Sequence, residues 1–169
     1  MTRMRRAIAS ALLAFGILLA SGTAAHAAPS YGDQMSRMNG NINNISLGQF
    51  LYNRNNNVAL GLNWANWSSD QCSAPLIGNG PFNFINPCLR HDFGYRNLKR
   101  VESTFGRNVW ERLNKGNADT RFGSDLDRRC DAFPYYDYPL CQASAAGYEK
   151  AVREHDIDTN NVERFSLWW

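Results

Sequence analysis

The four cysteines of this chain leave few folds open to it. They are Cys72, Cys88, Cys130 and Cys141 in a chain of 169 residues. An even number of cysteines in an exported protein predicts disulfides, and four cysteines allow three pairings. We favour the two local pairs, Cys72–Cys88 and Cys130–Cys141, because short loops cost the least entropy to close. A zinc site is the alternative, but no two of these cysteines have the close spacing that zinc sites use.

The start of the chain has the three parts of a secretory signal peptide. An arginine-rich segment is followed by an uncharged run over residues 7–20 and then by Ala25-His26-Ala27, which matches the small-x-small pattern of a cleavage site. The run is shorter than the roughly 20 apolar residues that cross a bilayer. We therefore predict a signal peptide over residues 1–27, cleaved near Ala27, and a secreted protein whose single domain covers residues 28–169.

The exported domain has balanced charge. The whole chain has 18 basic and 15 acidic residues, and three of the basic residues lie in the signal peptide. Cleavage therefore leaves as many acidic as basic residues. Nucleic-acid-binding proteins need a basic surface, because phosphate contacts dominate their affinity. The composition argues against a nucleic acid as partner.

Apolar spacing in the first half of the domain indicates little regular structure. Residues 29–45 are rich in Gly, Asn and Ser, and they predict a loose lead-in. Leu47, Phe50 and Leu51 fit a helix that weakens at Asn55-Asn56-Asn57, since asparagine competes with the helical backbone. Residues 68–87 carry many turn residues and predict a loop.

The second half of the domain is predicted to be helical. We expect helices over residues 88–100, 117–132 and 141–157, joined by segments with Gly and Pro. Asn86 is the expected N-cap of the first of these helices, with Pro87 in its first position. No stretch alternates as a strand would. The fold class is therefore all-α, a small disulfide-linked helical bundle.

A base and a carboxylate stand side by side in the segment Cys88-Leu-Arg-His91-Asp92. Adjacent helical residues project about 100° apart, so His91 and Asp92 can flank one crevice. The local disulfide would hold Asp70 and the backbone carbonyl of Gln71 near them. Carboxylate and carbonyl oxygens are the ligands that calcium prefers. These residues predict a calcium site made by Asp70, Gln71 and Asp92.

The His-Asp pair has other readings. Most such pairs lie on solvated surfaces, and the pair alone carries little information. Some intracellular phosphohydrolases bind metal through a His-Asp pair, but they need further histidines. Only His155 remains in the exported domain, so that class is excluded.

A second carboxylate is predicted to face the core. Phe122, Leu126 and Cys130 follow Asp119 at helical spacing and form one apolar stripe. A carboxylate on a buried stripe needs a partner, because an unpaired buried charge costs several kcal/mol. We expect Asp119 to accept the ring N–H of His91 and to fix its tautomer. The alternative is that Asp119 is an ordinary residue at the start of a helix, near Asn117.

Asp125 and Asp127 fall off that stripe. They stand close to Arg128 and Arg129 in the sequence. The pattern predicts that all four side chains are solvated on the outer face of the helix.

Four segments of the chain resemble the bacterial and fungal secreted phospholipases A2. They are Trp67-Ser-Ser-Asp-Gln-Cys72, Pro81-Phe-Asn-Phe84, Cys88-x-x-His-Asp-Phe-Gly-Tyr-Arg-Asn97 and Asp119-x10-Cys130. The third segment is the most specific of the four. The sequence departs from the family pattern at two places. Gln71 stands where the family usually has an apolar residue, and the segment 98–118 is longer than in typical members.

The resemblance implies a fold and an activity. The fold is a small all-α bundle of the secreted phospholipase A2 type, with two local disulfides. His91 would activate a water that attacks the sn-2 ester of a glycerophospholipid, and Asp119 would orient His91. Ca²⁺ would be the cofactor, held by Asp92, Asp70 and the Gln71 carbonyl. The partner would be a phospholipid membrane surface or micelle, and we expect a monomer.

Three other classes of protein could account for parts of this pattern. A serine lipase would carry a G-x-S-x-G segment, which the chain lacks. A non-catalytic secreted module that binds calcium and lipid would keep Asp70 and Asp92 but would not need His91 or Asp119. A structural or toxin-like protein would use the same fold without turnover.

Overall fold

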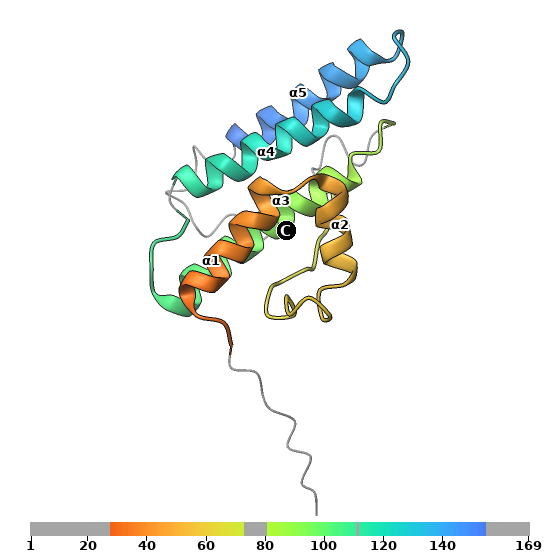
Figure 1. Cartoon of the computed structure of the whole chain (residues 1–169). Helices are drawn as coiled ribbons and strands as arrows, with labels where there is room; N and C mark the ends of the chain where they lie inside the picture. Colours follow the sequence, from red (N-terminus) through yellow and green to blue (C-terminus); the bar gives the residue numbers. More distant parts are fainter. Residues whose placement is uncertain (1–27, 73–80, 111, 155–169) are drawn as a thin grey trace, which may run out of the picture.

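The computed structural model describes residues 28–72, 81–110 and 112–154 (Figure 1). The predicted signal peptide and His155 lie outside these ranges. The described part is helical and contains no strand, which confirms the all-α prediction. None of the described helices combines the length and the hydrophobicity of a transmembrane span. Its elements are α1 (Tyr31–Asn39), the π-helix η1 (Gly40–Asn44), α2 (Leu47–Asn55), α3 (Ile85–Phe105), α4 (Arg112–Cys130) and α5 (Tyr138–Glu154).

The predicted loose lead-in is wrong, because α1 and η1 fill most of it. Helix α1 begins after Ser30, whose side chain accepts the backbone N–H of Asp33 as an N-cap does. Gln34, Met38 and Ile42 are spaced four residues apart and are all buried. Only two members of this stripe are apolar, so the many Asn and Gly residues around it concealed the helical period.

Helix α2 confirms the helix predicted around Leu47, Phe50 and Leu51. Ser46 caps its start by accepting the backbone N–H of Gln49. Phe50 is buried, and the helix ends at Asn55, the first of the three asparagines.

Helix α3 is longer than predicted at both ends. It begins at Ile85, with Phe84 in the N-cap position and no side-chain cap, so the prediction of Asn86 as N-cap is wrong. Phe84 is fully buried, with its ring 5.3 Å from that of Tyr148. We infer that this packing, rather than capping chemistry, sets where the helix begins. At the other end, Gly106 has a φ of 61° and closes the helix in the left-handed conformation that glycine adopts freely.

Helices α4 and α5 lie side by side and form a hairpin over α3 (Figure 1). Helix α4 begins before the predicted start at residue 117 and ends at Cys130. Gly123 allows the close approach of α5, because a Cβ there would lie 2.9 Å from the carboxylate of Glu149. Gly94 plays the same role between α3 and α4, where a Cβ would lie 3.4 Å from that of Ala118.

Both predicted disulfides are present. Cys72 is bonded to Cys88 and Cys130 to Cys141, with Cα–Cα distances of 5.4 and 5.5 Å. The four cysteines are buried in one core cluster, which also contains Phe84, Phe122, Leu126 and Tyr148. A second cluster surrounds Phe50, Phe93 and Leu98. Helices α3 and α4 contribute to both clusters, so the middle of α3 is held rigidly between them.

Candidate active site

The side chains of His91 and Asp119 meet between α3 and α4. Nε2 of His91 lies 2.9 Å from Oδ1 of Asp119, and both residues are buried. The imidazole ring packs against the rings of Tyr95 and Phe122, at centroid distances of 4.2 and 4.7 Å. Asp119 therefore faces His91 from the helical stripe that the sequence indicated.

Asp119 has two further donors. The hydroxyl of Tyr95 donates to its Oδ1 at 2.7 Å, and Nζ of Lys115 donates to its Oδ2 at 2.6 Å. Burial acts to raise the pKa of Asp119, but the hydrogen bonds from His91, Lys115 and Tyr95 outweigh it and lower the pKa below the ordinary value. The carboxylate therefore stays ionised at neutral pH.

The charge on Asp119 fixes the tautomer of His91. An ionised carboxylate can only accept hydrogen bonds, so the proton between the two residues belongs to Nε2 of His91. In the neutral ring, Nδ1 then carries a lone pair. Such a nitrogen can take a proton from a water molecule that it contacts.

The loop before Cys72 is held against α3 by the motif residues around His91. Asn97 is fully buried, and its side chain bonds both the N–H and the carbonyl of Asn66, each at 2.7 Å. The Trp67 ring packs against that of Phe93 at a centroid distance of 4.4 Å, with the two planes inclined by 34°. These contacts fix the path of residues 66–72 beside the helix.

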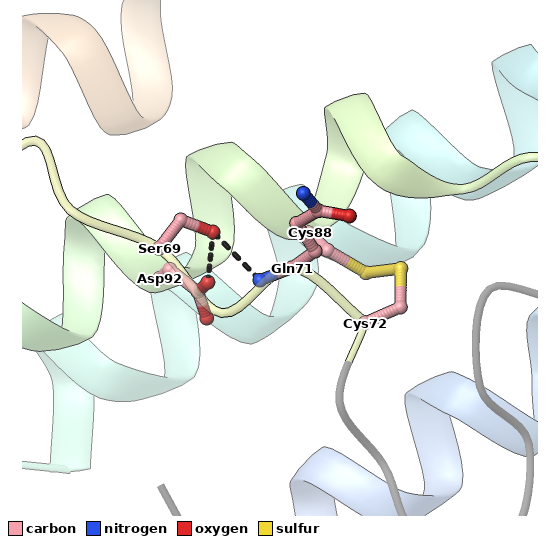
Figure 2. The surroundings of a disulfide bond; sticks show 5 residues. All are labelled: Ser69, Gln71, Cys72, Cys88 and Asp92. Carbon is pink, nitrogen blue, oxygen red and sulfur yellow. Dashed lines mark hydrogen bonds between the residues drawn. A yellow bond between two sulfur atoms is a disulfide. The ribbon is translucent and has the colours of Figure 1, made fainter.

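Ser69 connects this loop to Asp92 (Figure 2). Its hydroxyl donates to Oδ2 of Asp92 and accepts the backbone N–H of Gln71 at 2.8 Å. Gln71 has a φ of 64°, an unusual left-handed conformation for a residue other than glycine. The adjacent Cys72–Cys88 disulfide ties this strained turn to α3. The loop that contains Asp70 and Gln71 therefore lies beside Asp92, as predicted.

The two predicted carboxylate ligands differ in their present partners. Asp92 is buried, whereas Asp70 is partly exposed and forms an ion pair with Arg96. Burial raises the pKa of Asp92 to about 6, the hydrogen bond from Ser69 opposes the rise, and the charge of Asp70 adds to it. A cation bound beside Asp92 would stabilise its ionised form, which burial and the neighbouring charge of Asp70 disfavour.

The residue types expected to hold calcium fit a hard cation. They are the carboxylates of Asp70 and Asp92 and the backbone carbonyl of Gln71, all of which would bind through oxygen. In the described part of the chain, no group of three or more His, Cys, Asp or Glu side chains is placed to hold a metal ion. The remaining positions around an ion would therefore fall to backbone oxygens, water and substrate.

Comparison with known proteins identifies the family. The sequence profile described as "Prokaryotic phospholipase A2" matches residues 39–156, more than half of the chain. The chain belongs to this family. The match spans the 66–72 loop and helices α3 and α4, which carry the geometry described above.

A fungal protein is similar over a shorter stretch. The chain is 37% identical over 67 residues to a protein named "Secretory phospholipase A2" from Arthroderma benhamiae. The stretch covers 40% of this chain and 41% of the fungal protein. The chain thus matches about two fifths of the length of this relative. The resemblance to prokaryotic and fungal phospholipases A2 that the sequence indicated is confirmed.

The structure adds residues that the sequence analysis missed. Tyr95 and Lys115 are both donors to Asp119, and Ser69 is a donor to Asp92. Lys115 stands four residues before Asp119, so helical spacing alone could have placed the two side by side. The same spacing places Tyr95 beside His91, and its bond to Asp119 then depends on the expected contact between His91 and Asp119. No such signal exists for Ser69, because it lies in a loop.

The prediction that Asp125 is solvated is wrong. Its side chain is fully buried, and its Oδ2 lies 3.0 Å from Nε of Arg90. The reason is that α4 is covered by α5 on one side and by α3 and η1 on others, so more than one stripe of the helix is buried. Asp127 and Arg128 are exposed as predicted, and Arg129 is partly buried.

Proposed function

We propose that this chain is a secreted, calcium-dependent phospholipase A2. It would hydrolyse the sn-2 ester of glycerophospholipids to a lysophospholipid and a fatty acid. The observation that carries this proposal is the buried contact between His91 and Asp119, which leaves Nδ1 of the ring as a base. Membership of the prokaryotic phospholipase A2 family supports the choice of substrate.

His91 acts as general base and then as general acid. Its Nδ1 takes a proton from a water molecule while the water oxygen attacks the ester carbonyl carbon. Asp119 accepts the Nε2–H bond throughout and stabilises the imidazolium that forms. The imidazolium then returns its proton to the departing glycerol oxygen, so that the ester bond breaks and the ring is neutral again.

Asp92, Asp70 and the Gln71 carbonyl would hold the calcium ion. When bound, calcium acts as a Lewis acid that neutralises the substrate phosphate and the oxyanion formed at the carbonyl. Asp70 would have to exchange its ion pair with Arg96 for the metal. Breaking that pair costs part of the binding energy, so a modest calcium affinity is expected.

Chelation is the experiment that tests this proposal. We expect purified protein to hydrolyse phospholipid with calcium present and to lose this activity in excess chelator, with recovery when calcium is restored. Asp92→Asn should weaken calcium binding by about tenfold or more, because it removes a charged ligand. Activity that is unchanged in chelator would refute the metal assignment. Calcium and lipid binding without hydrolysis would instead favour a non-catalytic module.

The role of Asp119 can be separated from metal binding. Asp119→Asn should lower the hydrolysis rate by about tenfold or more, because an amide can hold the wrong tautomer of His91 and does not stabilise the imidazolium. Calcium affinity, measured by calorimetry, should stay near its original value, because Asp119 is not a predicted ligand. The matched control is Asp127→Asn, on the exposed face of the same helix. An equal loss of rate in both variants would contradict the assignment.

A further inference from the structure

The connection between α4 and α5 presents large apolar side chains to solvent. Tyr135, Tyr136 and Leu140 have exposed fractions of 93%, 74% and 63%, and Tyr138 is also exposed. They belong to the connection after Cys130 and to the first turn of α5, and the turn of this hairpin is at the upper right in Figure 1. Single exposed apolar residues are common, but several together indicate a contact surface. We call this segment, residues 131–140, the tip.

The tip is held in a defined shape. The Cys130–Cys141 disulfide closes it, and the N–H of Asp137 donates to the carbonyl of Pro134 at 2.9 Å. On its inner side, the ring of Phe133 packs edge-on against Phe82 at a centroid distance of 5.2 Å. The tyrosines are therefore exposed by a rigid turn, so little entropy is lost when they bind.

The charge around the tip does not favour a highly charged partner. The exposed neighbours Asp127, Asp131 and Arg128 include both signs, and Asp137 is partly exposed. Arg129 adds a second positive charge, which its Nε–H bond to the carbonyl of Phe82 at 3.0 Å holds beside the tip, so these acidic and basic side chains nearly balance. A surface with apolar bodies, polar hydroxyl tips and no excess of positive charge matches an interface that is itself electrically neutral.

We propose that Tyr135, Tyr136 and Leu140 form a docking surface for a zwitterionic phospholipid interface. Tyrosine rings settle at the level of the lipid headgroups, where the ring is in an apolar environment and the hydroxyl remains hydrated. This inference rests on the proposed function, since the substrate of that reaction lies in such an interface. The contact between Phe133 and Phe82 joins the tip to the segment that leads into α3, the helix that carries His91.

The test measures binding without turnover. Vesicles of a diether phosphatidylcholine have no carboxylic ester to hydrolyse, and an excess of chelator removes calcium from the assay. In a flotation assay, the Tyr135→Ser/Tyr136→Ser variant should bind these vesicles about tenfold more weakly than the unaltered chain, because two rings no longer leave water. Adding salt should change the binding of the unaltered chain little, since its charges are balanced.

Hydrolysis supplies the second readout. The double variant should act normally on a short-chain phospholipid kept below its micelle concentration, and it should be slower on vesicles of an ordinary phosphatidylcholine. Tyr135→Trp/Tyr136→Trp should keep vesicle binding, because tryptophan also settles at the interface. If the chain has no hydrolytic activity at all, the proposed phospholipase function fails. The flotation result still decides whether Tyr135, Tyr136 and Leu140 form a docking surface.

The matched control lies elsewhere on the molecule. Tyr52 is also exposed, on α2, close in sequence to the exposed Val58 and Leu60. Tyr52→Ser should leave vesicle binding unchanged. The proposal is overturned if Tyr52→Ser weakens binding and the double variant does not. It is also overturned if the double variant changes only the self-association of the chain in the absence of vesicles, which sedimentation would detect.

Discussion

Replacing His91 by glutamine is expected to lower the rate of phospholipid hydrolysis by about a hundredfold to ten-thousandfold, the usual contribution of a positioned general base. Glutamine can still donate to Asp119, but its amide cannot take a proton from water. Because His91 is not among the oxygen ligands assigned to calcium, the affinity for the ion should remain. The fold should remain as well, since α3 is held by buried residues on both sides of this position.

Three measurements on the same sample separate the possible causes of a lost rate. Hydrolysis of a short-chain phospholipid reports the reaction, calorimetry reports calcium affinity, and thermal unfolding reports the fold. The expected result is a change in the first alone. A variant that hydrolyses at the original rate would show that the base is another group. A variant that also loses calcium binding would show that His91 helps to hold the metal site.

The arrangement of the candidate site residues could be predicted from the sequence largely because several of them are local. His91, Asp92 and Cys88 lie within two turns of one helix, so their relation follows from helical geometry. The apolar stripe that follows Asp119 predicts that this residue faces the core, and the structure places it beside His91. The disulfide pairing followed from loop length, and it brings the 66–72 loop to α3.

Other features depend on contacts between distant segments, and the sequence could not indicate them. Helix α1 is stabilised by burying Met38 against the rest of the fold, although its own composition is polar. The start of α3 is set by Phe84 packing against Tyr148 on α5. The burial of Asp125 depends on how many neighbours cover α4, which the period of a single helix does not report.

The buried ion pair between Arg90 and Asp125 leads to the largest expected effect on stability. Both side chains are almost fully buried, and Arg90 also donates to the carbonyl of Ile45 at 2.8 Å. Burial lowers the pKa of Arg90 to about 10, although the charge of Asp125 acts to raise it. Arg90→Met should reduce the free energy of unfolding by about 3–5 kcal/mol, because it leaves the Asp125 carboxylate buried with less compensation.

The effect should depend on pH in a defined direction. Burial raises the pKa of Asp125 above its ordinary value even with Arg90 present, and Arg90 acts to lower it. Without Arg90, the folded state should favour the protonated carboxyl still more. When the pKa of a group is higher in the folded than in the unfolded state, its contribution to the free energy of unfolding is present at low pH. That contribution is lost as the pH rises through the folded-state pKa. The stability difference between Arg90→Met and the unaltered chain should therefore shrink as the pH is lowered.

A second variant distinguishes a lost ion pair from a badly packed core. Arg90→Met/Asp125→Leu removes both charges, and it should recover much of the lost stability, because replacing a whole buried pair by apolar groups costs little. Asp127→Asn is the control for a carboxylate on the exposed face of α4, and it should change stability by no more than about 0.5 kcal/mol. Chemical denaturation of the four proteins at neutral and acid pH gives all these values. A double variant less stable than Arg90→Met alone would mean that the arginine stabilises the fold through its bond to Ile45 and its packing. The charge of Asp125 would then not be the cause.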